Sequence, residues 1–162
     1  MSVVDHLVHE NERYISTFPG TRPTRPKLRL AVLACMDSRL DLFGALGLEI
    51  GDAHLIRNAG GIPTDDALRS LALSQRALGT REIVVIHHTQ CGMDGFDDDA
   101  FRAELEAESG VRPPWRVTGF TDLYEDTRQS VKTVRDCPWL LHRDEVSGFV
   151  FDVETAKITA VE

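Results

Sequence analysis

Cysteine is scarce in this sequence, with only Cys35, Cys91 and Cys137 among 162 residues. An odd and sparse set does not form a disulfide framework, so a reducing, cytoplasmic compartment is expected. The sequence also lacks the run of ~20 apolar residues that a membrane span requires. Its first residues carry neither the basic nor the apolar segment of a signal peptide. We therefore expect a cytoplasmic protein with no membrane association.

Positive charge is scarce as well, because 18 Lys and Arg residues face 26 Asp and Glu residues, for a net charge of −8. This balance disfavours nucleic-acid binding, and no run rich in Lys or Arg offsets it. The length is typical of one domain covering residues 1–162. A domain near this size buries roughly 68–70% of the surface that its unfolded chain exposes, so it can hold a rigid site without disulfides.

Apolar residues at helical spacing predict helices over 3–18, 64–78, 97–107 and 121–136. Continuous apolar runs predict strands over 28–34, 53–57, 82–86 and 148–153, with a short strand over 157–161. Strands that alternate with helices indicate an α/β fold with right-handed crossovers. The prediction is a single domain with a mostly parallel central sheet, flanked by helices and closed by a C-terminal edge strand.

Three side chains with metal-binding atoms follow two of these strands. Cys35 comes directly after the strand over 28–34, and His88 and Cys91 follow the strand over 82–86. Ligands of open parallel sheets gather at the carboxyl ends of the strands, so both groups are expected at one place. Two thiolates and an imidazole suit Zn²⁺, and three protein ligands leave its fourth position open, as in catalytic sites.

Each cysteine alone is weak evidence, since a lone cysteine after a strand is usually a small buried apolar residue. The combination of Cys-x-Asp-x-Arg with His-x-x-Cys-Gly is much stronger. The segments 34–39 (ACMDSR), 56–61 (IRNAGG) and 88–92 (HTQCG) resemble the β-class carbonic anhydrases in order and spacing. The likeness covers roughly residues 28–152 and is nearest to the short, compact branch of that family.

The resemblance implies that Cys35, His88 and Cys91 bind one Zn²⁺ per chain. It implies that Asp37 accepts a hydrogen bond from the zinc-bound water and that Arg39 holds Asp37. In a closed form of the family site, Asp37 itself takes the fourth zinc position and catalysis stops. The alternative for Asp37 and Arg39 is an ordinary surface ion pair.

The resemblance places the turn at Gly60 and Gly61 beside the zinc, where a backbone N–H can approach the substrate. The alternative is an ordinary turn between a strand and a helix. Plant-like members of the family carry a substrate-contacting Gln near the position of Glu49. An acidic side chain there would repel bicarbonate, so no role is assigned to Glu49. His87 is expected to point to the opposite face of the sheet from His88, because neighbouring strand residues alternate.

The function implied is the reversible hydration of CO₂ to bicarbonate and a proton, by attack of zinc-bound hydroxide. One alternative is hydrolysis of carbonyl sulfide or carbon disulfide on the same site. Another is a catalytically silent zinc-binding module, and thiol redox chemistry is disfavoured because no Cys-x-x-Cys is present. The resemblance also implies a homodimer or a dimer of dimers. Residues 1–27, a helix followed by a Pro-rich linker, are expected to face a neighbouring subunit.

Overall fold

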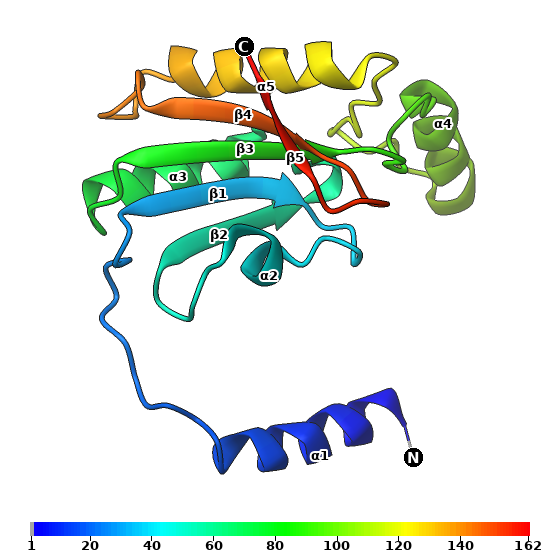
Figure 1. Ribbon diagram of the computed structural model, residues 1–162. Coiled ribbons are helices and arrows are strands. Elements are labelled where there is room, and N and C mark those ends of the chain that lie inside the picture. The colour runs from blue at the N-terminus through cyan, green and yellow to red at the C-terminus, as the bar shows by residue number, and fades with distance from the viewer. Residues whose placement is uncertain (1) are drawn as a thin grey trace.

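The computed structural model describes residues 2–162 and contains one five-stranded sheet (Figure 1). Its strands are β1 (Leu30–Cys35), β2 (Ala53–Asn58), β3 (Glu82–His88), β4 (Val146–Phe151) and β5 (Ile158–Val161). The spatial order is β2-β1-β3-β4-β5. The first four strands run parallel, and β5 pairs antiparallel with β4 at the edge. The predicted fold class is therefore confirmed, including the C-terminal edge strand.

The helices are α1 (Val3–Ile15), α2 (Leu42–Leu46), α3 (Asp65–Arg76), α4 (Asp98–Ser109) and α5 (Leu123–Asp136). Thr64, Asp97 and Asp122 cap α3, α4 and α5 by accepting hydrogen bonds from backbone N–H groups of the first turn. Such caps satisfy donors that have no partner within the helix, which explains where these three helices begin.

Two short elements were not predicted from the sequence, α2 and the 3-10 turn Ala59–Gly61. Neither is long enough for an apolar repeat of 3.6 residues to show. The predicted strand over 28–34 begins too early, because Arg29 has a left-handed backbone with φ of 55°. The predicted strand over 148–153 is displaced, since β4 covers Val146–Phe151.

Each face of the sheet has its own apolar core. On one face, Leu71 of α3 and Val134 of α5 pack against strand residues such as Ala31 and Val85. On the other face, Val32 and Ile86 pack with residues around α2 and with the segments that follow β1 and β3. The carboxyl ends of the central strands lie beside this second core, which surrounds Cys35 and Cys91 with apolar side chains.

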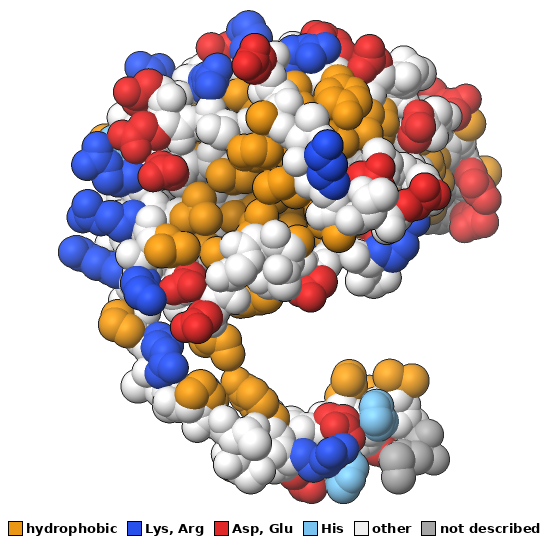
Figure 2. Space-filling model, in the orientation of Figure 1, with side chains coloured by type: hydrophobic (Ala, Val, Ile, Leu, Met, Phe, Trp, Pro, Cys, Tyr) orange, Lys and Arg blue, Asp and Glu red, His pale blue; other side chains and the backbone are white. Residues whose placement is uncertain are grey.

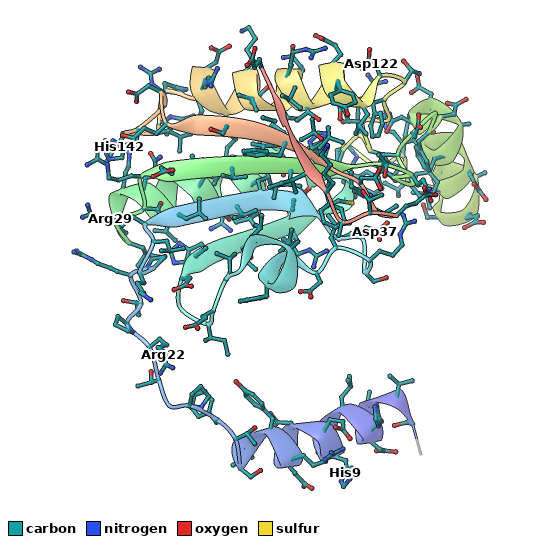
Figure 3. The ribbon with its side chains drawn as sticks, viewed as in Figure 1. His9, Arg22, Arg29, Asp37, Asp122 and His142 are labelled. Carbon is teal, nitrogen blue, oxygen red and sulfur yellow. The ribbon has the colours of Figure 1, made fainter. Side chains whose placement is uncertain are left out.

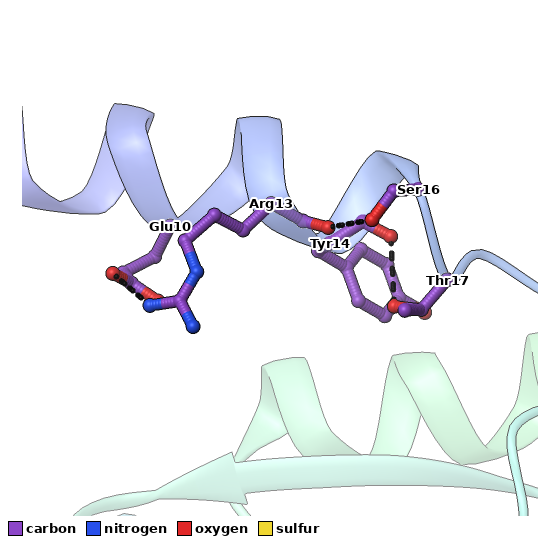
Figure 4. A pocket seen from close by; sticks show the side chains of 5 residues that line it. All are labelled: Glu10, Arg13, Tyr14, Ser16 and Thr17. Carbon is purple, nitrogen blue, oxygen red and sulfur yellow. Dashed lines mark hydrogen bonds and ion pairs between the residues drawn. The ribbon is translucent and has the colours of Figure 1, made fainter.

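Helix α1 stands apart from the body on an extended linker (Figure 1). It has no buried residue, although Val4, Leu7 and Val8 give it an apolar side. Its last turn is closed by local hydrogen bonds, from Ser16 Oγ to the Arg13 carbonyl and from Thr17 Oγ1 to the Tyr14 carbonyl (Figure 4). The apolar side of α1 therefore has no covering within the described residues of this chain.

Helix α5 approaches β4 so closely that Gly148 has no room for a side chain. A Cβ atom there would lie 2.7 Å from Val131 Cγ2. We expect Gly148→Ala to lower the free energy of unfolding by about 1–3 kcal/mol, as overpacked cores do. Urea denaturation at a fixed protein concentration measures the change. Ser147→Ala, at the exposed neighbouring position, is the control, and equal stability of both variants would contradict the close packing.

Candidate metal centre

Three potential ligands meet at the carboxyl ends of β1 and β3. Cys35 is the last residue of β1 and His88 the last of β3, while Cys91 follows three residues later. Their ligand atoms all lie within 4.8 Å of one another. All three side chains belong to buried residues, with 5%, 1% and 8% of the surface of Cys35, His88 and Cys91 exposed. The structure thus brings together the three residues that the sequence selected as ligands.

The ring of His88 is oriented for a metal ion. Its Nδ1 lies 2.9 Å from the Thr89 carbonyl, which can only accept a hydrogen bond, so Nδ1 carries the proton. Nε2 then presents a lone pair, and this buried atom has no hydrogen-bond partner. Metal-binding histidines are held in this way through their second ring nitrogen. The donor set therefore fits a soft divalent cation of the zinc type.

The two thiols beside His88 interact strongly. The nearby side chain of Cys91 is the main cause that lowers the pKa of Cys35. The same closeness of the two sulfur atoms raises the pKa of Cys91, because a second negative charge beside Cys35 is disfavoured, and burial adds to the increase. Backbone N–H groups of Asp37 and Gly60 also favour a charged Cys35. A bound cation would favour the charged form of both thiols and displace their protons.

A carboxylate and a guanidinium lie beside the ligands, at the point labelled Asp37 in Figure 3. Arg39 donates to Asp37 through Nε (2.9 Å), Nη2 (2.7 Å) and its backbone N–H (2.9 Å). This side-chain bond with Arg39 is the main reason why the pKa of Asp37 lies well below its usual range. Asp37 Oδ2 is 3.9 Å from His88 Nε2. An ionised acceptor is thus held at the edge of the ligand group.

Strand β2 supplies a further support that was not identified from the sequence. Arg57 donates from Nε to the Cys35 carbonyl (2.9 Å) and from Nη2 to the Asp37 carbonyl (2.6 Å). The Asn58 carbonyl accepts the N–H of Met36 at 2.8 Å. Both residues belong to the segment 56–61 that carries the resemblance, which is the only signal the sequence gave of them. They fix the chain on both sides of the first ligand.

The turn after β2 presses against the same ligand. Gly60 and Gly61 have φ of 79° and 69° and are buried. A Cβ atom on Gly61 would lie 2.7 Å from the Cys35 nitrogen and 2.8 Å from the Ala34 carbonyl carbon. Only glycine permits this approach. The turn is therefore adjacent to the site, as the sequence suggested.

Other polar residues lie elsewhere. His87 points to the α5 side of the sheet, with Nδ1 2.9 Å from Asp126 Oδ2. His54 Nδ1 is 2.8 Å from Ser74 Oγ, in the core contact between β2 and α3. Glu49 precedes β2 and lines a hollow with Arg22 and Lys27, at the amino ends of the strands and away from the ligands.

Comparison with known proteins agrees with this arrangement. The family model described as carbonic anhydrase matches residues 30–109. Beta-carbonic anhydrase 1 of Mycobacterium tuberculosis is 47% identical over 161 residues, covering 99% of each chain. The chain belongs to the β-carbonic anhydrase family. A crystal structure of carbonic anhydrase from Streptococcus mutans superposes with a TM-score of 0.92 at 39% identity, covering 100% of this chain and 99% of that one.

A second group of similar proteins carries a different name. A carbon disulfide hydrolase of Acidithiobacillus thiooxidans is 37% identical over 151 residues, which cover 80% of this chain and 75% of that protein. The family thus includes proteins with two different names, carbonic anhydrase and carbon disulfide hydrolase. Among residues 2–162, no helix has the length and apolar character needed to cross a bilayer.

The contact between Gly61 and the first ligand can be tested by substitution. We expect Gly61→Ala to displace Cys35 and reduce the zinc bound per chain after loading with Zn²⁺, measured by elemental analysis. Gly47→Ala is a matched control, because Gly47 also has a positive φ (63°) but nothing within 4 Å of an added Cβ. Both variants carry backbone strain of about 1–3 kcal/mol. Full zinc content in Gly61→Ala would show that the contact does not position the ligand.

Proposed function

We propose that this protein catalyses the reversible hydration of CO₂ to bicarbonate and a proton, with one Zn²⁺ per chain held by Cys35, His88 and Cys91. The observation that carries the proposal is the buried group of two thiols and an unpartnered imidazole nitrogen beside an ionised Asp-Arg pair. The full-length likeness to a β-carbonic anhydrase supports it. Three buried free cysteines fit a reducing compartment, so we place the protein in the cytoplasm.

Zn²⁺, when bound, supplies a Lewis acid that makes water a competent nucleophile at neutral pH. The chain's residues supply the rest. Cys35, Cys91 and His88 would hold the ion. Their burial keeps bulk water away from the donor atoms, which strengthens electrostatic interactions at the site.

Asp37 is proposed to orient the attacking water. Its carboxylate accepts a hydrogen bond from the water and so aims an oxygen lone pair at the carbon of CO₂. Arg39 occupies both carboxylate oxygens, with a backbone N–H added to Oδ1. These bonds limit the rotation of Asp37 and keep it ionised. Gly60 and Gly61 expose backbone beside the site, where an N–H can contact an oxygen of CO₂ or bicarbonate.

A second candidate substrate is carbon disulfide or carbonyl sulfide. The relatives named carbon disulfide hydrolase support it, at 34–37% identity over about four fifths of this chain. The same nucleophile and the same Asp37 would serve, because both molecules are linear with an electrophilic carbon. The higher identity and fuller coverage of the carbonic anhydrase relative favour CO₂.

The test is stopped-flow CO₂ hydration by zinc-loaded protein from pH 6.5 to 9. We expect rapid hydration, and a loss of about 10- to 100-fold in kcat for Asp37→Ala, as when an orienting partner beside a metal is removed. Asp66→Ala is the matched control, because Asp66 forms a similar 2.7 Å pair with Arg69 on the exposed side of α3. Carbon disulfide and carbonyl sulfide are assayed in parallel. No CO₂ hydration by fully loaded protein would refute the proposal, and turnover of a sulfur compound would replace it.

We further propose that the protein assembles with copies of itself, and that residues 1–27 bind a neighbouring subunit. The second face of the sheet is only partly covered, with half-buried Leu55, Val84 and Phe149. Figure 2 shows hydrophobic side chains gathered across the middle of this face. Helix α1 offers a complementary apolar side, with Leu7 61% exposed. A second copy would cover both surfaces at once, whether the assembly is a dimer or a dimer of dimers.

Light scattering tests this assembly. We expect a particle of at least two chains, and fewer chains per particle when residues 2–26 are deleted. Leu7→Glu should weaken the assembly in the same direction, because it places a charge on the apolar side of α1. Glu12→Ala, at an exposed polar position of the same helix, should leave the mass unchanged. An unchanged number of chains per particle after the deletion would exclude a role for this segment in assembly.

A further inference from the structure

Gln90 has an unusual backbone for its residue type. It lies between the ligands His88 and Cys91 and adopts φ of 54°. This left-handed region is uncommon for residues other than glycine and persists where surrounding contacts hold it. The conformation therefore depends on what holds Gln90 in place.

Two hydrogen bonds hold Gln90, one at its backbone and one at its side chain. The Gln90 carbonyl accepts a hydrogen bond from Arg39 Nη2 at 2.8 Å. The Gln90 side chain donates from Nε2 to Glu154 Oε1 at 2.7 Å. The first bond joins the ligand loop to the Asp37–Arg39 pair, and the second joins it to the turn between β4 and β5.

That turn is itself well fixed. Asp152 Oδ1 accepts the N–H groups of Glu154 (2.8 Å) and Thr155 (2.9 Å). These bonds lower the pKa of Asp152, which stays ionised and keeps the turn closed. The Val153 N–H donates to Thr89 Oγ1 at 3.0 Å. The turn that carries Glu154 is therefore bonded to Thr89, the residue before Gln90. This bond keeps Glu154 close to the Gln90 side chain.

We infer that Glu154 is a positioning residue for the Asp37–Arg39 pair, acting through Gln90. It holds the Gln90 side chain, which keeps the left-handed backbone and aims the Gln90 carbonyl at Arg39. Arg39 is then bonded on two sides, to the Asp37 carboxylate and to the Gln90 carbonyl. The inference deepens the proposed function, because it concerns the orientation of the same carboxylate.

Loss of the bond to Glu154 would allow Gln90 to adopt a different backbone conformation. Without its partner, Gln90 is free to return to negative φ, which rotates the neighbouring peptide units. The carbonyl then no longer meets Arg39 Nη2, and Arg39 keeps only its bonds to Asp37. The Asp37–Arg39 pair can then move as a unit relative to the three metal ligands. A displacement of about 1 Å in a reacting geometry can reduce a rate by up to ~10²-fold.

The experiment compares three variants with the wild-type protein, all loaded with Zn²⁺. We expect Glu154→Ala to lower kcat for CO₂ hydration roughly tenfold, with unchanged zinc content and unchanged thermal midpoint. Glu154→Gln should retain activity, because its amide oxygen still accepts from Gln90 Nε2. In the double variant Gln90→Asn with Glu154→Ala, kcat should recover, because Asn enters the left-handed region more readily than Gln.

Hydrogen exchange gives a readout that does not depend on activity. The Arg39 N–H bonds to Asp37 Oδ1 and the Leu40 N–H to the Asp37 carbonyl. We expect both amides to exchange faster in Glu154→Ala and to regain protection in the double variant. Glu125→Ala is the control, because Glu125 is another exposed acceptor of a side-chain bond, 2.9 Å from Arg128.

The outcomes separate this inference from the proposed function. An active wild type with unchanged kcat and exchange in Glu154→Ala would overturn the inference and leave the function standing. A loss of kcat that neither Glu154→Gln nor the double variant restores would also overturn it. An inactive wild type whose Arg39 amide still responds to Glu154→Ala would refute the proposed function and support the positioning role.

Discussion

The candidate site depends on the register of three parallel strands. β1 pairs with β3 so that Ala34 lies opposite Ile86, which places Cys35 and His88 at neighbouring strand ends. β1 also pairs with β2 so that Cys35 lies opposite Asn58, and this brings Arg57 and Gly61 to the same edge. A shift of β1 by one residue would turn Cys35 to the other face of the sheet. Backbone hydrogen bonds of the sheet thus set the distances among the donor atoms.

Negative charge gathers at this edge, and the structure balances it with arginine. Two thiols and the Asp37 carboxylate lie together, and the pKa of Arg39 is raised, mainly by its bond to Asp37 and also by the nearby cysteines. Arg57 adds a second guanidinium, bonded to the backbone carbonyls of Cys35 and Asp37. Arginine suits both tasks, because its planar fork donates several bonds in fixed directions and stays charged. A divalent cation held by Cys35, His88 and Cys91 would add positive charge at this edge.

The sequence predicted the sheet, four of the five helices and the three potential ligands, because each leaves a local signal. Apolar runs mark the buried strands, and Thr64 and Asp97 mark helix starts. Contacts between distant segments leave no such signal. The bonds of Arg57 to the first ligand loop join residues about 20 positions apart, and the bond of Gln90 to Glu154 joins residues 64 apart. The short helix α2 was not predicted for a different reason, because five residues cannot show a helical period.

The extended linker before β1 also has a mechanical consequence. Residues 19–26 are rich in proline and hold α1 away from the body, and eight extended residues span at most about 26–29 Å. Any surface that α1 covers must lie within this reach plus the length of the 13-residue helix, about 20 Å. In a symmetric pair each chain would lend an arm to the other, an arrangement akin to domain swapping. When one arm dissociates, the other arm still holds the two subunits together. The dissociated arm therefore stays at a high local concentration near its binding surface and can rebind. Subunits joined in this way exchange slowly even when each contact alone is weak.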